Sequence, residues 1–266
     1  MCGRYASSRS PEDLVEEFDV LDPRIEAPLA PSYNVAPTDK VYAVMERAVR
    51  ADDGTKGDPV RQLRELRWGL VPSWAKDPSI GSRMINARLE TAPEKPAFRK
   101  AWASRRCLLP ADGYFEWYDT QQTTAKGKPV KQPFFITPAD GSVLAMAGLY
   151  EIWRDRSLSE DDVEAFRWSC TILTTEAEDE IGQIHDRMPL IVPRDRRSAW
   201  LSPATTTDDL TELVVPAQQS GLQAFPVSPA VGNVRNNSPE LIEPLPAEVE
   251  RVETPVESEE PALWND

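Results

Sequence analysis

The sequence predicts an α+β domain built around a largely antiparallel, curved, barrel-like β-sheet with flanking helices. Apolar segments rich in β-branched and aromatic residues recur along the chain, and polar segments containing Gly, Pro, Asn or Asp separate them. Few segments have a helical pattern. Strands that follow one another through short polar turns are typical of antiparallel sheets, which often curve and close on themselves.

The individual elements follow from these patterns in chain order. The first is a helix over residues 11–20, because Ser10 can cap it and Pro11 suits its first position. Strands are predicted over residues 41–48, 63–70, 107–118, 133–137, 143–153 and 166–175. Two further helices are predicted over residues 95–104 and 208–215. The polar segments 51–58, 120–131 and 155–162 are expected to be hairpin tips or insertions.

The domain organisation is predicted to be one catalytic domain over residues 1–245 and an acidic, disordered tail over residues 246–266. A chain of 266 residues can bury a full core, and the Pro- and Glu-rich end cannot. No stretch reaches the roughly 18 uninterrupted apolar residues that a membrane span requires, and the first residues lack the apolar core of a signal peptide. We therefore expect a cytoplasmic monomer that does not engage membranes.

The net charge of −14 argues against a general nucleic-acid coat protein, because non-specific affinity comes mainly from Lys and Arg at phosphates. Part of this charge is local. Residues 240–266 carry nine acids against the single Arg251, which leaves about −6 on the rest of the chain. Any binding of nucleic acid must therefore rest on specific contacts.

The three cysteines, Cys2, Cys107 and Cys170, are an odd number at wide spacing. This pattern favours neither a disulfide framework nor a metal cluster. Cys107 and Cys170 lie in apolar segments and are expected in the core. We expect neither a metal nor another cofactor.

The amino terminus carries the first sign of chemistry. Methionine removal acts before small second residues, so the mature chain is expected to begin with Cys2 and expose a 1,2-aminothiol. An α-amine has a pKa near 7.7 to 8.0, so roughly a tenth of it is neutral at pH 7, far more than for lysine. Such an amine can form an imine with an aldehyde, and the thiol can then close a five-membered thiazolidine.

Two other interpretations of the same terminus remain open at this point. Cys2 could follow Met1 by chance at a frayed end. Alternatively, class II glutamine amidotransferases also begin MCG and use the cysteine thiolate to attack a side-chain amide. The terminus alone does not separate these interpretations from aldehyde capture.

Internal motifs separate them. In order, they are residues 32–38 (SYNVAPT), 67–75 (RWGLVPSWA), 85–91 (INARLET), 113–117 (GYFEW) and 185–189 (HDRMP). Together with MCG they resemble the SOS-response-associated peptidase (SRAP) family, also called abasic-site processing proteins. The resemblance runs from Cys2 to about Pro244, and the amidotransferases have no comparable set.

The resemblance implies that Cys2 is the nucleophile, that Asn86 orients it, and that Glu116 and His185 do the acid and base work. The residue types suit this chemistry, because imine formation needs both a proton donor and an acceptor. His185 is the single histidine of the chain. Side chains alternate along a strand, which predicts that Glu116 lies on the face opposite to that of Phe115 and Trp117. Partial burial would raise the pKa of Glu116.

Single-stranded DNA containing abasic sites is the partner that the resemblance implies. Phosphate contacts are expected from the guanidinium groups of Arg4, Arg88 and Arg187. The indoles of Trp68 and Trp74 are expected to stack on unpaired bases. One departure concerns residues 94–98 (EKPAF), where family members can carry a further arginine; Lys95 and Arg99 are its possible replacements.

Three functions are compatible with these features. The first is an abasic-site sensor that forms a covalent thiazolidine crosslink to single-stranded DNA through Cys2, with lyase-like Schiff-base chemistry, and protects the lesion. The second is a cysteine-type peptidase or autopeptidase at the same site, although removal of Met1 alone needs no self-cleavage. The third is a damage-binding module whose acidic tail recruits partners, and this function would not need Cys2.

Overall fold

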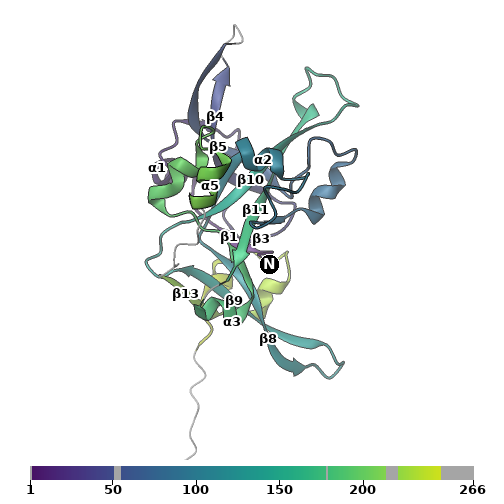
Figure 1. Ribbon diagram of the computed structural model, residues 1–266. Helices are drawn as coiled ribbons and strands as arrows, with labels where there is room; N and C mark the ends of the chain where they lie inside the picture. The colour runs from purple at the N-terminus through teal and green to yellow at the C-terminus, as the bar shows by residue number, and fades with distance from the viewer. Residues whose placement is uncertain (1, 51–54, 178, 214–220, 247–266) are drawn as a thin grey trace, which may run out of the picture.

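The computed structural model describes residues 2–50, 55–177, 179–213 and 221–246, and it contains two β-sheets (Figure 1). Strands of the larger sheet are β2 (Asp22–Arg24), β4 (Lys40–Arg50), β5 (Lys56–Trp68), β6 (Asn86–Arg88), β7 (Arg106–Ala111), β10 (Leu144–Arg154), β11 (Phe166–Glu176) and β12 (Arg187–Pro189). Strands of the smaller sheet are β1 (Tyr5–Ser7), β3 (Ser32–Val35), β8 (Gly113–Thr123), β9 (Pro129–Pro138) and β13 (Leu222–Pro226).

The larger sheet closes into a barrel. Its strand order is β12-β11-β10-β7-β4-β5-β2, and most neighbouring strands are antiparallel. A parallel pairing of β5 with β11, with Arg67 opposite Ser169 and Trp68 opposite Cys170, joins the two sides. The ring β11-β10-β7-β4-β5 is therefore complete. The predicted α+β fold with a curved, mainly antiparallel, barrel-like sheet is confirmed.

Alternation along the strands divides the core into two layers. The barrel interior is a cluster that includes Met45, Leu66, Cys107 and Cys170. A second cluster on the outer face takes the intervening residues of the same strands. The helices that cover this outer face are α1 (Pro11–Glu17), α2 (Arg99–Ser104), α4 (Arg197–Leu201) and α5 (Thr207–Leu213).

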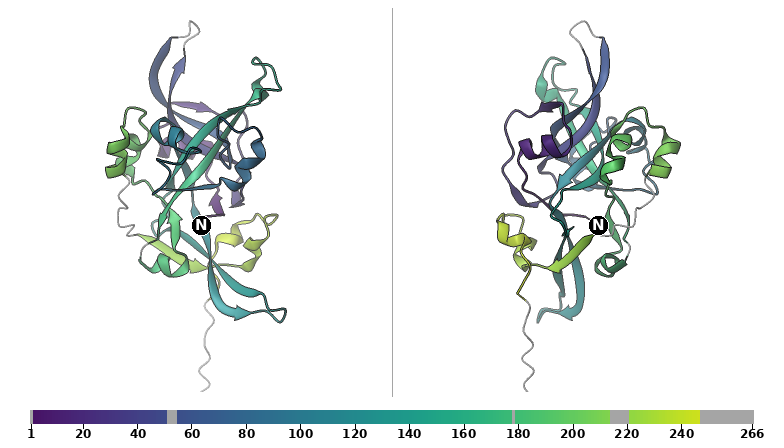
Figure 2. Two further views of the ribbon diagram at one scale, coloured as in Figure 1. Left: turned by 45° about the vertical axis from the view of Figure 1, so that its right-hand side comes forward. Right: turned by 90° about the vertical axis from the view of Figure 1, so that its left-hand side faces the viewer.

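The smaller sheet continues from the barrel through β7 and β8. The order of its strands is β13-β9-β8-β1-β3. Helix α3 (Asp179–Ile184) packs against β8. The chain also forms the short 3₁₀ helices η1 (Pro78–Arg83), η2 (Val163–Ala165), η3 (Arg194–Arg196), η4 (Pro229–Gly232) and η5 (Pro239–Ile242). The β4–β5 and β8–β9 hairpins project from opposite ends of the molecule in both views of Figure 2.

The predicted single strand over residues 107–118 is wrong, because β7 and β8 are separate strands in different sheets. The chain turns at Asp112, whose carboxylate accepts hydrogen bonds from the Ser8 amide at 2.6 Å and from Arg9 Nε at 3.1 Å. Gly113 follows, where a Cβ atom would lie 2.4 Å from the Phe135 ring. The corner therefore depends on partners that are distant in the sequence.

Helix α1 begins as predicted. Ser10 accepts a hydrogen bond from the Asp13 amide, and Asp13 accepts one from the Ser10 amide, which forms a capping box. The helix ends at Glu17 instead of Val20, because Asp19 adopts a positive φ of 50°.

The other predicted elements occur with shifted ends. Strands β4, β5, β9, β10 and β11 overlap five predicted strands, and β5 ends before Gly69, whose φ is 128°. Helix α2 begins at Arg99, four residues later than predicted. Helix α5 matches the last predicted helix as far as Leu213, while residues 214–215 and the tail from residue 247 lie outside the described residues. In the described part of the chain, no helix has the length and apolarity that crossing a membrane requires.

The tight barrel interior predicts that Gly148→Ala destabilises the protein. A Cβ atom at Gly148 would lie 2.2 Å from Leu109 Cδ1 and 2.9 Å from the Thr171 carbonyl oxygen. We expect a loss of about 1 to 3 kcal/mol in the free energy of unfolding, measured by urea titration. Gly232→Ala is the matched control, because nothing lies within 4 Å of its added methyl group. Equal stability of the two variants would contradict the packing argument.

Candidate functional site

Strand β1 brings the amino-terminal segment to the junction of the barrel and the smaller sheet (Figure 1). Tyr5 lies opposite Tyr114 of β8 in an antiparallel pairing, and the Phe115 amide donates to the Arg4 carbonyl at 3.0 Å. In an antiparallel pair, the residues that precede one partner lie opposite the residues that follow the other. The residues before Arg4 therefore lie toward Glu116.

Cys2 is completely buried in the barrel-interior cluster. Asn86 on β6 donates a hydrogen bond from Nδ2 to the Cys2 carbonyl oxygen at 2.7 Å, and the thiol contacts the Arg4 carbonyl at 3.9 Å. Burial raises the pKa of the Cys2 thiol far above its usual range, and the negative charge of Glu116 raises it further. The thiol is therefore protonated at neutral pH.

Glu116 on β8 is 3% exposed. Burial raises its pKa from 4.5 to about 7, although the positive charge of the chain's amino terminus acts in the opposite direction. As predicted, Glu116 and Phe115 lie on opposite faces, because Phe115 belongs to the core of the smaller sheet. A carboxyl group with this pKa can both donate and accept a proton near neutral pH.

Tyr114 is a site residue that the sequence analysis did not assign. It lies on the same face of β8 as Glu116, two residues earlier. Its hydroxyl is buried without a hydrogen-bond partner among the described residues. Burial raises the pKa of this hydroxyl well above 10.0, and the charges of Cys2 and Glu116 raise it further. The sequence does contain one sign of this role, because Tyr114 stands two residues before Glu116 on a predicted strand and so shares its face.

His185 follows helix α3 directly, and its side chain is 30% exposed. Nδ1 accepts a hydrogen bond from the Arg187 amide at 3.0 Å, so the neutral ring carries its proton on Nε2. The Asp186 carboxylate lies 3.0 Å from the same Nδ1 and can pair with it only after protonation. Burial lowers the pKa of His185, as does the positive amino terminus, and we therefore assign the neutral ring at pH 7.

Arg4 is held beside this site by Asn34, a residue that the sequence analysis did not assign. Arg4 Nη1 donates to Asn34 Oδ1 at 2.7 Å and to the Val231 carbonyl at 2.8 Å. The buried Asn34 amide also donates to the carbonyls of Val231, Asn233 and Asn236. These bonds tie β3 to η4 and to the residues that follow it. A single asparagine at a strand position gave no sign of this role.

Arg88 and Arg187 differ in availability. Arg88 is exposed, and it shares one face of β6 with Asn86. Arg187 is 8% exposed, and it donates to the two carboxylate oxygens of Glu90 at 2.7 and 3.0 Å and also to the Thr174 carbonyl. A phosphate at Arg187 would therefore compete with Glu90.

The expected stacking of Trp68 on a base is wrong for this structure, because Trp68 is completely buried. Its ring contacts the Tyr5 ring edge-on at 5.2 Å, and Nε1 donates to the Ile85 carbonyl at 2.9 Å. Trp74 is 56% exposed, and its Nε1 donates a hydrogen bond to the Pro96 carbonyl at 3.5 Å. Lys95 and Arg99, the possible replacements for the missing arginine, are both exposed.

The fold and site define a class of α+β protein in which a buried cysteine at the amino terminus lies with an amide, a carboxyl group and an imidazole at one end of a barrel. A family model described as SOS response associated peptidase (SRAP) matches residues 1–234. The chain belongs to this family, which confirms the resemblance drawn from its motifs.

Similar proteins extend along nearly the whole chain. Abasic site processing protein YoaM of Bacillus subtilis is 38% identical over 244 residues, which are 91% of this chain and 98% of that protein. Abasic site processing protein YedK of Escherichia coli is 36% identical over 253 residues, which cover 92% of this chain and 100% of that protein. A crystal structure of a Bacteroides thetaiotaomicron protein has the same fold, with a TM-score of 0.71 at 22% identity, and covers 92% of this chain and all 100% of its own.

The raised pKa of Glu116 predicts how Glu116→Gln changes stability with pH. The folded chain holds this proton more tightly than the unfolded chain, so wild-type stability is lost as pH rises from 4.5 through about 7. Glutamine does not titrate. At pH values above 7, Glu116→Gln should therefore gain on the order of 3 kcal/mol over wild type, relative to pH 4.

Urea unfolding at pH 4 and pH 8 measures this change. The matched control is Glu94→Gln, which removes an exposed glutamate. A stability difference between wild type and Glu116→Gln that is equal at both pH values would contradict the assignment.

Proposed function

We propose that this protein processes abasic sites in single-stranded DNA by forming a covalent crosslink through Cys2 after Met1 has been removed. The amine of Cys2 attacks the aldehyde of the ring-opened deoxyribose, and the thiol then closes a thiazolidine. The adduct shields the lesion from strand cleavage. The observation that carries this proposal is the bond from Asn86 to the Cys2 carbonyl beside the half-protonated Glu116.

The relatives support the substrate. Proteins of Bacillus subtilis and Escherichia coli that share more than a third of their residues with this chain are named abasic site processing proteins. The match to the family model covers the segments that carry Cys2, Asn86, Glu116 and His185, because it runs over residues 1–234.

The Asn86 amide supports an orienting role. Its Nδ2 fixes the Cys2 carbonyl, while its Oδ1 is buried without a partner among the described residues. An unpaired buried acceptor costs about 1 to 3 kcal/mol, so a donor that reaches it is favoured. The amine of the mature Cys2 belongs to the same residue as the fixed carbonyl and can supply that donor.

The acid and base steps divide between Glu116 and His185. As the sugar opens to the aldehyde, neutral His185 accepts the proton of the C1′ hydroxyl and then gives a proton to the deoxyribose ring oxygen, so the ring ends neutral again. The amine nitrogen then adds to the carbonyl carbon. Protonated Glu116 gives its proton to the carbinolamine hydroxyl, which leaves as water, and the resulting carboxylate accepts the proton that the amine loses.

Thiol addition completes the product. The Cys2 sulfur forms a bond with the imine carbon, and the thiol proton is transferred to the nitrogen, so no oxidant or reductant is needed. Because burial keeps this thiol protonated, the amine attacks first and the sulfur follows. The amine and the thiol belong to one residue, which gives ring closure a high effective molarity.

DNA contacts are assigned to Arg4, Arg88 and Arg187, with Trp74 as the stacking residue. Arg88 is the readiest phosphate ligand, since its guanidinium is exposed on the same strand face as Asn86. Arg187 takes part when the phosphate displaces Glu90 or is bound beside it. An unpaired base next to a lesion is open to stacking, which favours single strands over duplex.

Peptidase activity at the same Cys2 is the second candidate, because the family description contains that word. A cysteine peptidase attacks with a thiolate, whose formation a low pKa favours. The buried Cys2 thiol has the opposite shift. Aldehyde capture by the amine is therefore the function that this environment supports best.

The crosslink itself is the first test. Mature wild-type protein incubated with a single strand containing one abasic site should give a slow band on a denaturing gel, and Cys2→Ala should give none while it still binds the strand. Cys2→Ser should form an imine that borohydride traps, but no heat-stable adduct, because a hydroxyl does not close the sulfur ring. An equal adduct in wild type and Cys2→Ala would refute the proposal.

The phosphate contact gives a second test. Arg88→Gln should weaken strand binding and lower the slope of log affinity against log salt by about 1, because one phosphate contact is lost. Arg83→Gln, an exposed arginine on η1, is the matched control. Fluorescence anisotropy across a salt series measures both variants. Indistinguishable slopes for the two variants would remove Arg88 from the DNA contact.

A further inference from the structure

The barrel end opposite Cys2 carries a group of inward-facing arginines. On β4, β5 and β7, the interior residues Met45, Leu66 and Cys107 belong to the barrel core. The same alternation assigns three residues, each two positions beyond one of these, to the interior face: Arg47 on β4, Arg64 on β5 and Arg105 just before β7. Arg105 is six positions from Ala111 at the Cys2 end, about 20 Å at the usual rise per strand residue.

Two of these arginines are stacked on one indole. The guanidinium carbon of Arg47 lies 4.8 Å from the centre of the Trp168 ring, and that of Arg64 lies 4.5 Å from it. Tyr150 stacks on the same indole at 5.9 Å with an interplanar angle of 14°. These contacts hold the two guanidinium groups in place, so less side-chain entropy is lost when they bind a ligand.

The positive charges are close enough to act on one another. Burial lowers the pKa of Arg64, and the charges of Arg47 and Arg24 lower it further. Burial raises the pKa of the Tyr150 hydroxyl, while Arg47, Arg105 and Arg64 all oppose that change. A chain with a net charge of −14 thus concentrates positive charge at this end of the barrel.

Carboxylates neutralise only part of this charge. Arg105 is paired with the buried Glu151 at 2.8 Å, yet its Nε is buried without a hydrogen-bond partner. Arg64 Nε donates to Gln62 at 2.8 Å, a neutral partner. Within the described parts of the chain, neither Arg47 nor Arg64 forms an ion pair with a carboxylate.

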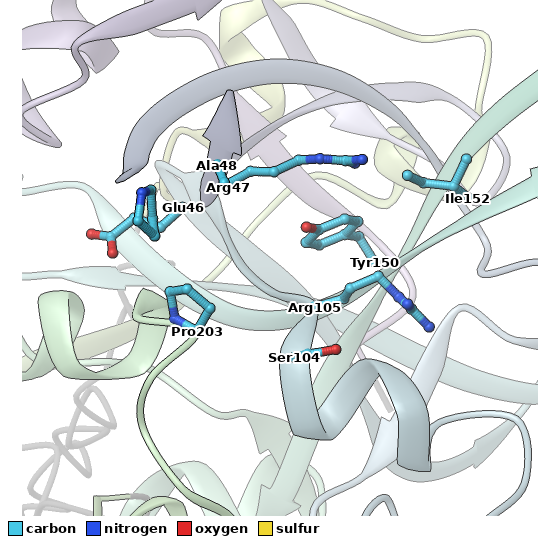
Figure 3. Close-up of a pocket in the computed structure, with 9 residues that line it drawn as sticks. Glu46, Arg47, Ala48, Ser104, Arg105, Tyr150, Ile152 and Pro203 are labelled. Carbon is cyan, nitrogen blue, oxygen red and sulfur yellow. The ribbon is translucent and has the colours of Figure 1, made fainter. Parts of the chain in front are cut away.

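A cavity of about 360 Å³ opens beside this group. Its lining includes Arg47, Ser104, Arg105 and Tyr150 (Figure 3). Figure 3 shows Arg47 and Arg105 extending past the Tyr150 ring in the same direction, while the Glu46 carboxylate points the opposite way. That carboxylate is paired with a different arginine, Arg61, at 2.8 Å. Figure 3 also shows the Tyr150 hydroxyl at the end of its ring away from the two guanidinium groups, so the cavity combines donors from two arginines and a serine with room for a small anion.

We propose that this cavity is a phosphate-binding site, separate from the Cys2 site, in which Arg47 and Arg105 bind the phosphate oxygens and Ser104 completes the donor set. Guanidinium groups match the geometry of phosphate. Arg64, which lies over the Trp168 ring, adds its positive charge to the electrostatic attraction for the phosphate. The phosphate can belong to a free nucleotide or to the backbone of a nucleic acid strand, since both present the same group. The site is independent of the crosslinking chemistry.

Titration of the full chain with inorganic phosphate, adenosine 5′-monophosphate and a short undamaged DNA strand tests this site. We expect Arg47→Gln to weaken binding of the recognised probe about tenfold, as for the loss of a charge-assisted hydrogen bond, and Arg64→Gln to weaken it less. Arg194→Gln is the matched control, because its side chain is 71% exposed. Thermal unfolding of each variant confirms that it is folded.

The probes distinguish the sources of the phosphate. If Arg47→Gln weakens the binding of phosphate or of the mononucleotide, the site is assigned to a free phosphate compound. If it weakens the binding of the DNA strand alone, the site is assigned to a nucleic acid backbone. If no probe depends on Arg47, or if Arg194→Gln has the same effect, the site is overturned. Crosslinking to an abasic strand is measured in parallel, and its failure in wild type would count against the proposed function alone.

Discussion

The antiparallel pairing of β1 with β8 is the constraint on which the site depends. It joins Tyr5 to Tyr114, and so it fixes a chain end that would otherwise fray against the strand that carries Glu116. Asn86 then holds the Cys2 carbonyl from a third strand. Cys2 thus precedes β1, which is hydrogen-bonded to the strand of Glu116, while Asn86 lies on β6, which pairs with β11 of the larger sheet. These pairings leave the three side chains little freedom to move apart.

Burial governs the protonation states once these groups are assembled. The same low-polarity surroundings raise the pKa of the Cys2 thiol, of Glu116 and of Tyr114, because each would carry a negative charge there. His185 is shifted in the opposite direction, because its charged form is positive. At pH 7 the site therefore favours neutral forms of Cys2, Tyr114 and His185 and leaves Glu116 divided between its two forms, a state that suits condensation of an amine with an aldehyde better than attack by an anion.

Local patterns in the sequence were sufficient for most of the longer strands and for the capped start of α1. The motifs also named Cys2, Glu116 and His185 as site residues, and their roles stay predictions. They failed where distant partners decide the structure. Three-residue strands such as β1 and β6 are too short to show a period, and the corner at Asp112 depends on Ser8 and residues beyond it. Burial of Trp68 follows from closure of the barrel, which no local pattern reports.

Closure of the barrel has a consequence for how the protein is made. The parallel contact of β5 with β11 joins Arg67 to Ser169 across about 100 residues, and such distant pairings form slowly because loop entropy is lost before contacts compensate it. The amino terminus leaves the ribosome first, while His185 follows after most of the chain. A nascent chain thus carries its cysteine long before His185, and under the proposed function the site is assembled only when synthesis of the domain and closure of the barrel are complete.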